Sequence, residues 1–167
     1  MKNYFNEIVI NDNMNSINEM IDYYSGELES ARREINKTGN IEKISMELPG
    51  IIEYRFNQLQ TIESVLEYLN IKRKYLFSKK YKEFVEKNSK LLKIKDIEYF
   101  INCDTEIMEM DMLINIVSNI RNRYLGIMKG LENKAFQLNN ITKLKCQGLE
   151  DSYVGFSYIK VKDDDDK

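Results

Sequence analysis

The sequence predicts an all-α fold: an elongated helical protein with a long C-terminal coiled-coil-like helix, assembling into a homo-oligomer. Three observations support this prediction. Helix-breaking residues are rare, with one proline and seven glycines in 167 residues. Apolar residues make up 43% of the chain and charged residues 31%, which is typical of soluble, helix-rich proteins. Apolar positions also repeat at alternating spacings of three and four residues across the segment 104–148.

The segment 104–148 carries two apolar stripes. The main seam consists of Ile107, Met110, Ile114, Val117, Tyr124, Met128, Leu131, Ala135 and Leu138. A second stripe of Leu113, Ile116, Ile120 and Ile127 lies beside it. Two stripes present more apolar area than one neighbouring helix can cover, so we expect assembly through this helix. The predicted oligomer interface consists of Ile107, Met110, Ile114, Val117, Arg121, Tyr124, Met128 and Leu131.

Arg121 is the one charged residue on this seam. A cation at such a position either pairs with a carboxylate of another helix, such as Glu109 or Asp111, or turns outward into solvent. The paired alternative would fix the register of the assembly, and it is the interpretation that we favour.

The chain divides into three predicted parts: 1–48, 49–148 and the tail 149–167. Residues 1–48 form an N-terminal arm and a first helix, in which residues 1–11 lack periodicity, Asp12 or Asn13 caps the helix and Gly39 ends it. A linker covers residues 40–47. Residues 49–148 form the helical core, which begins with Pro49 in a first helical turn and includes a basic segment, 71–95, and the long helix, 105–147.

Two stretches resist a helical assignment. Residues 90–103 are compatible with a strand or loop containing a short turn over 96–100. The tail 149–167 is rich in β-prone and aromatic residues and could form a strand that adds to a neighbour. Its last five residues, 163–167, spell DDDDK, which matches a tag remnant as well as a natural acidic tail.

Composition argues against several classes of protein. The chain has no histidine, the most common general base and metal ligand, and it has no glycine-rich phosphate-binding loop. We therefore expect no enzyme and no cofactor. Cys103 and Cys146 are too few and too far apart for a disulfide framework. No membrane-spanning run or leader is recognisable, so we expect a cytoplasmic protein, in the host cytoplasm if a phage encodes it.

Charge is distributed in blocks. Residues 71–95 carry ten Lys or Arg against two Glu, residues 96–116 carry six acids and no base, and residues 117–148 return to a balance of +5. Four acids of the middle block, Asp104, Glu106, Glu109 and Asp111, suit the start of a helix better than a divalent-ion site. Blocks of this kind indicate specific electrostatic partners, within an oligomer or outside it.

The basic segment 71–95 also contains four aromatic residues, Tyr75, Phe77, Tyr81 and Phe84. Cations that follow phosphates, together with rings on which bases stack, are the two components of a single-stranded nucleic-acid site. Two alternatives remain open at this point. The segment could bind a protein or an acidic lipid, or the lysines could be no more than the solvated face of a helix.

The stretches IKRKYLFSKKYK at 71–82 and KAFQLNNITKLKCQGLED at 134–151 resemble the small recombination mediators of T4-type phages, the UvsY family. The resemblance covers residues 50–150. It implies an oligomeric, single-stranded-DNA-binding protein that helps a RecA-like recombinase replace a single-strand-binding protein. It places DNA contact on Lys72, Arg73, Lys74, Tyr75, Lys79, Lys80 and Tyr81. Departures from the family pattern include Lys134 in place of an arginine and the lack of an aromatic-glycine turn after the basic run.

The expected function is therefore that of a recombination mediator whose partners are further copies of itself, single-stranded DNA, a recombinase and a single-strand-binding protein. The alternative is a coiled-coil structural or adaptor protein, such as a phage-like assembly or scaffold component, that has no nucleic-acid role. The two differ in whether the basic segment binds a short oligonucleotide with a strong dependence on salt.

Overall fold

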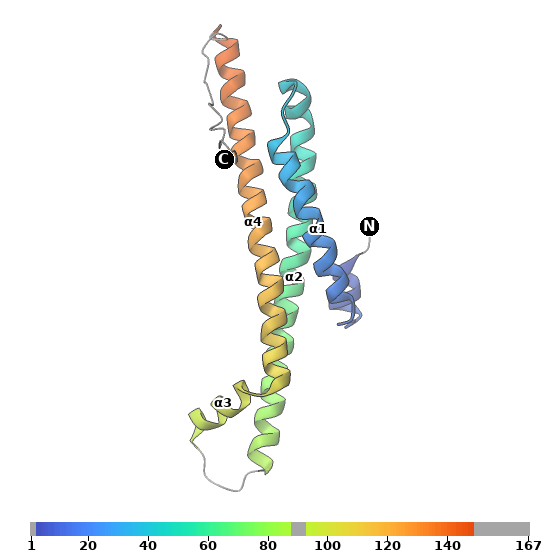
Figure 1. Ribbon diagram of the computed structural model, residues 1–167, viewed down its shortest axis with the longest axis vertical. Helices are drawn as coiled ribbons and strands as arrows, with labels where there is room; N and C mark the ends of the chain where they lie inside the picture. The colour runs from blue at the N-terminus through green and yellow to red at the C-terminus, as the bar shows by residue number, and fades with distance from the viewer. Residues whose placement is uncertain (1–2, 88–92, 149–167) are drawn as a thin grey trace, which may run out of the picture.

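The computed structural model describes residues 3–87 and 93–148, and every element in this part of the chain is helical (Figure 1). A short π-helix, η1 (Phe5–Ile10), precedes α1 (Ser16–Asn36), α2 (Ile41–Lys87), α3 (Ile94–Asn102) and α4 (Thr105–Cys146). The helices α2 and α4 run antiparallel as a long pair, and α1 lies along one half of that pair. The predicted all-α class and long C-terminal helix are confirmed; the expected strand in 149–167 lies outside the described residues.

The main core lies where α1, α2 and α4 meet. Its fully buried side chains include Leu28 of α1, Ile62 of α2 and Leu131 of α4. Tyr24 and Tyr124 meet edge to face with ring centroids 5.8 Å apart, which joins α1 to α4. The apolar seam of α4 is thus covered by two helices of the same chain.

The start of α2 corrects the predicted boundary between linker and helix. Residues 41–47 are helical, and Pro49 lies inside α2. The side chain of Asn40 accepts hydrogen bonds from the amides of Glu42 and Lys43, so Asn40 caps the helix. Ile44 and Leu48 are buried on the core-facing side. Their burial offsets the missing donor of Pro49, a residue that costs about 3 kcal/mol inside a helix. Beyond this point α2 continues without a break to Lys87.

The N-terminal segment is a second correction. Residues 4–10 do not extend as an arm, because Tyr4 and Ile8 are buried against the core and Phe5–Ile10 forms η1. The helix α1 then starts at Ser16, slightly later than the predicted cap at residues 12 or 13. A short helix that packs mainly through two side chains leaves too weak a periodicity to be recognised in the sequence.

The third correction concerns α3. The stretch 94–102 forms a helix longer than the predicted turn at 96–100, while residues 90–92 lie outside the described part. Ile97 and Ile101 pack with Ile107 of α4 against Phe77 and Phe84 of α2, forming a small second core. The side chain of Asp104 accepts a hydrogen bond from the Glu106 amide and caps α4, as the sequence predicts. Among the described helices, none has the length and apolar character needed to span a membrane.

Candidate nucleic-acid interface

The candidate interface is built on the last turns of α2. Between Ile71 and Lys82 this helix has no acidic residue. One of its sides packs against α3 and α4 through the second core, and the opposite side is open to solvent. The cations of this stretch fall into two groups, according to whether an ion pair within the chain holds them.

The first group is neutralised within the chain. The ammonium of Lys72 lies 2.6 Å from a carboxylate oxygen of Asp12, and that of Lys80 lies 3.0 Å from Asp104. Arg73 holds both oxygens of Asp111, at 3.0 and 3.1 Å. Lys80 also contacts Glu106, at 3.1 Å. The acidic block of the sequence thus serves in part as an internal partner of the basic block.

These contacts shift the affected protonation equilibria. The pKa of Lys72 is raised, first by its hydrogen bond to Asp12, and the pKa of Lys80 is raised by its hydrogen bonds to Asp104 and Glu106. In return, the hydrogen bond from Lys80 lowers the pKa of the Asp104 carboxyl. Lys72, Lys80 and Asp104 are therefore charged at neutral pH, so their ion pairs are formed under ordinary conditions.

The second group forms the basic face, which we define as Lys74, Tyr75, Lys79 and Lys82. All four side chains are exposed, and none of the three lysines makes an ion pair within the described residues. Tyr75 is 71% exposed. Large aromatic rings are usually covered, so an exposed tyrosine between lysines offers a stacking surface beside free positive charge.

The predicted DNA-contact residues are thus divided by the structure. Lys74, Tyr75 and Lys79 lie together on the basic face, whereas Lys72, Arg73 and Lys80 are held in ion pairs. Tyr81 is half-buried against the second core and does not present a free ring. Lys82 is exposed but is absent from the predicted set, although its spacing of seven residues from Tyr75 indicates the same helix face.

Most residues of the predicted oligomer interface pack against other helices of the same chain and not against a second copy. Ile107, Val117, Tyr124, Met128 and Leu131 are buried inside the chain. Met110 and Ile114 are half-buried against the same core. The main core covers most of the seam with residues of α1 and α2, and α1 reaches it through contacts 100 residues apart, such as that between Tyr24 and Tyr124. Ile107 is covered in the second core instead. The five buried side chains are thus occupied by their own chain.

Arg121 finds its carboxylate within the chain. Its Nε lies 3.0 Å from Glu63 of α2, and the pair is about one-third exposed. Glu109 and Asp111, which the sequence analysis names as possible partners of Arg121, do not pair with it here. Asp111 pairs with Arg73, and Glu109 is exposed. The Arg121–Glu63 pair joins the two long helices near the middle of their contact.

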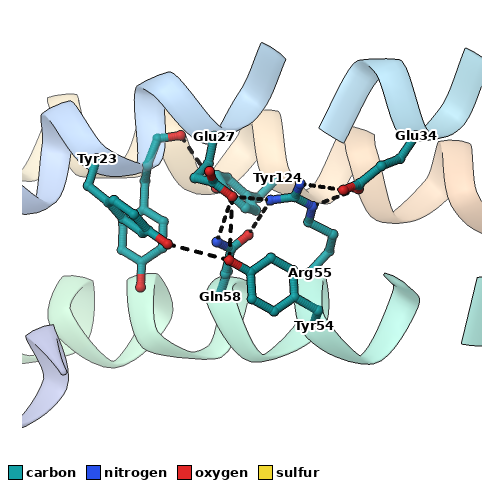
Figure 2. Close-up of polar contacts among 8 residues, drawn as sticks. Tyr23, Glu27, Glu34, Tyr54, Arg55, Gln58 and Tyr124 are labelled. Carbon is teal, nitrogen blue, oxygen red and sulfur yellow. Dashed lines mark hydrogen bonds and ion pairs between the residues drawn. The ribbon is translucent and has the colours of Figure 1, made fainter. Parts of the chain in front are cut away.

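A buried ionic cluster, which the sequence prediction missed, joins α1 to α2 (Figure 2). The side chain of Arg55 is only 1% exposed and contacts Glu27 at 2.7 Å and Glu34 at 2.6 Å. Gln58 accepts a further hydrogen bond from Arg55, at 2.8 Å, and Tyr54 donates one to Glu27. The sequence does hold a signal, because Arg55 lies four residues before buried Leu59, on the apolar side of α2.

Opposing effects set the pKa of Glu27. Burial raises it, but the hydrogen bonds from Arg55 and Gln58 outweigh that effect, so the pKa lies below its ordinary value. The Glu27 carboxylate is therefore ionised and Arg55 is paired at neutral pH. No small molecule has access to this guanidinium, so the cluster is a structural feature and not a binding site.

A mainly apolar groove of about 700 Å³ opens between α2 and α4 near the C-terminal end of α4. Its apolar lining comes from both helices: Leu48, Pro49, Ile52 and Phe56 of α2, and Ala135 and Leu138 of α4. Within the described residues there is no group of His, Cys, Asp or Glu that could hold a metal ion. Cys103 and Cys146 are both exposed free thiols.

Comparison with models of known protein families, with curated proteins and with solved structures finds no match to this chain.

Proposed function

We propose that this protein binds single-stranded DNA along the basic face of α2 and acts as a non-enzymatic recombination mediator that helps load a RecA-like recombinase. The observation that carries the DNA-binding part is the basic face itself. Lys79 and Lys82 lie on the same side of α2 as the exposed ring of Tyr75, and Lys74 is exposed roughly 100° around the helix from that ring. Within the described residues none of these three lysines has an ion-pair partner. The resemblance of residues 50–150 to the UvsY family supports the narrower role in recombination.

The arrangement suits a single strand better than a duplex. Lys74, Lys79 and Lys82 are distributed along about two turns of a straight helix, and Tyr75 lies among them. Lysines supply contacts to phosphates, and an exposed ring supplies a stacking surface that accepts any base. Such a site binds with little sequence preference, which is what a protein that acts along arbitrary single strands requires.

The test is a fluorescence-anisotropy titration with an oligo(dT) strand at several salt concentrations. Replacing Lys74, Lys79 and Lys82 together with Ala should flatten the slope of log affinity against log salt by about two units, since each phosphate contact on a single strand contributes roughly 0.7. Tyr75→Ala should weaken binding about tenfold and leave the slope unchanged, because stacking contributes about 1–3 kcal/mol per base.

The control for the triple variant changes three lysines that are equally exposed but lie elsewhere: Lys43, Lys129 and Lys143. It removes the same net charge, so it measures the effect of overall charge alone. Equal loss of affinity in the two triple variants would contradict a defined basic face. Stimulation of recombinase loading on strands coated with single-strand-binding protein then tests the role as a mediator.

A second candidate function, that of a coiled-coil structural or adaptor protein, is favoured by the groove between α2 and α4. Phe56, which lines it, is 47% exposed, and the groove is continuous with the main core through Leu48 and Leu138. We assign a second copy of this chain as the occupant, because one twofold axis would cover the groove of both copies at once. Self-association without any affinity for DNA would favour this candidate over the first.

A further inference from the structure

An acidic side chain already occupies one end of the cationic side of α2. Tyr68, Lys72, Tyr75, Lys79 and Lys82 follow one another at spacings of four, three, four and three residues, so Tyr68 and Lys72 extend the basic face by one turn. Both carboxylate oxygens of Asp12 lie on Lys72, at 2.6 and 2.7 Å. The hydroxyl of Tyr68 donates a hydrogen bond to the same carboxylate.

The groups around Asp12 are those that would bind a phosphodiester. An ammonium and a phenolic hydroxyl converge on one pair of anionic oxygens, and the ammonium also lies 5.4 Å from the centre of the Tyr68 ring. The hydrogen bond to Lys72 is the largest cause that lowers the pKa of Asp12. An anion is therefore the preferred occupant of this position.

The N-terminal segment holds Asp12 in place. Asp12 follows η1 and adopts a left-handed backbone conformation, with φ of 54°, which is uncommon outside glycine. Just before it, η1 is anchored by Ile8, which is fully buried, and just after it the amide of Asn13 donates to the carbonyl of Glu7. The carboxylate is thus presented to α2 by a folded segment and not by a freely moving tail.

From these contacts we propose that Tyr68 and Lys72 form an additional phosphodiester-binding position and that Asp12 occupies it as an internal phosphate mimic. DNA then gains this position only by displacing Asp12, so the N-terminal segment restrains binding along the basic face. This inference rests on the proposed function, because it names a further contact of the same interface and the group that competes for it.

The decisive variant is Asp12→Asn, since asparagine tolerates the left-handed backbone but lacks the negative charge. Helical circular dichroism checks that it folds. We expect it to bind oligo(dT) roughly two- to fivefold more tightly than the unmodified chain, the range that corresponds to an exposed ion pair. The salt slope should steepen by about 0.7, which is one further phosphate contact. Asp22→Asn is the control, because Asp22 is equally exposed on α1 and its change removes the same charge.

A double-mutant cycle then isolates Lys72. Lys72→Ala should change affinity little when Asp12 is present, and it should abolish the gain when Asp12 is Asn. Equal effects of Asp12→Asn and Asp22→Asn on a chain that does bind DNA would overturn the competition by Asp12 while leaving the proposed function intact. If neither the unmodified chain nor Asp12→Asn binds oligo(dT), both proposals are wrong.

A readout independent of affinity comes from hydrogen exchange. Saturating oligo(dT) should speed the exchange of backbone amides in residues 5–15, because displacement of Asp12 loosens the segment that presents it. Unchanged or slower exchange there, under conditions in which DNA is bound, would show that Asp12 remains in place and would overturn the inference.

Discussion

At the scale of single residues, burial decides what an ion pair does in this protein. Arg55 and Arg121 both join α2 to another helix through a carboxylate, but Arg55 is 1% exposed and Arg121 is 37% exposed. A buried guanidinium that loses its partner retains the full cost of its desolvation, whereas an exposed one is rehydrated. Arg55 therefore specifies how α1 sits on α2, and Arg121 contributes little to stability.

Substitution of the two arginines tests this contrast. We expect Arg55→Met to lower the free energy of unfolding by roughly 1–3 kcal/mol, because Glu27 and Glu34, each about one-quarter exposed, are left without their shared cation. Arg121→Met should lower it by about 0.5 kcal/mol or less. Urea denaturation of the two variants measures both values, and equal losses would contradict the role assigned to burial.

The lowered pKa of Glu27 makes the free energy of unfolding depend on pH. Because its pKa is lowered in the folded chain, its contribution is fully present above its ordinary pKa of about 4.5 and is lost as the pH falls through the lower folded value. Acid should therefore destabilise the unmodified protein over this range. In Arg55→Met that dependence should be shallower, since the largest stabilising contact to the ionised form is gone.

At the scale of elements, the packing of α1 on α4 depends on a glycine. A Cβ added at Gly130 would lie 2.7 Å from the terminal methyl of Ile35, so the two helices approach closely here. Lys134, one turn further along, donates hydrogen bonds to the carbonyls of Glu34 and Lys37 at the end of α1, both at 2.7 Å. Together these contacts fix where α1 ends against α4.

Two glycine substitutions in the same helix test the close approach. Gly130→Ala should leave the protein about 1 kcal/mol less stable than Gly126→Ala does, because the end of the Ile35 side chain must shift to make room for the new methyl group. Gly126→Ala should stabilise it by roughly 0.5–1 kcal/mol, because a Cβ there meets no atom within 4 Å and alanine is the better helix former. Thermal denaturation compares them, and a gain from Gly130→Ala as large as that from Gly126→Ala would contradict the close approach at Gly130.

At the scale of the whole molecule, α1 covers one side of the α2–α4 pair, and the groove lined by Ile52, Phe56 and Leu138 remains open. If a second copy fills it, the protein should be at least a dimer at micromolar concentration, as measured by sedimentation. Phe56→Glu should then shift it to a monomer, because a charge in an apolar interface has no partner.

The matched control for assembly is Met108→Glu, an equally simple change of an exposed apolar residue near the other end of α4. It should leave the sedimentation coefficient unchanged. A stable monomer for the unmodified chain would contradict self-association altogether and would leave the groove without an assigned occupant.

The sequence by itself determined the helical class, the cap at Asp104, the length of α4 and the positions of the apolar seam, because these follow from local spacing and capping. Tertiary structure alone decided what covers that seam. The spacing predicts that the seam has an apolar neighbour but not which segment provides it. Both α1 and α2 provide it, α1 through contacts about 100 residues apart in the chain. The same holds for charge. The cations of 71–82 are visible in the sequence, but an ion pair depends on proximity in space. Only the fold pairs Lys72, Arg73 and Lys80 with distant carboxylates, and in the part of the chain that the structure describes it leaves Lys74, Lys79 and Lys82 without such a partner.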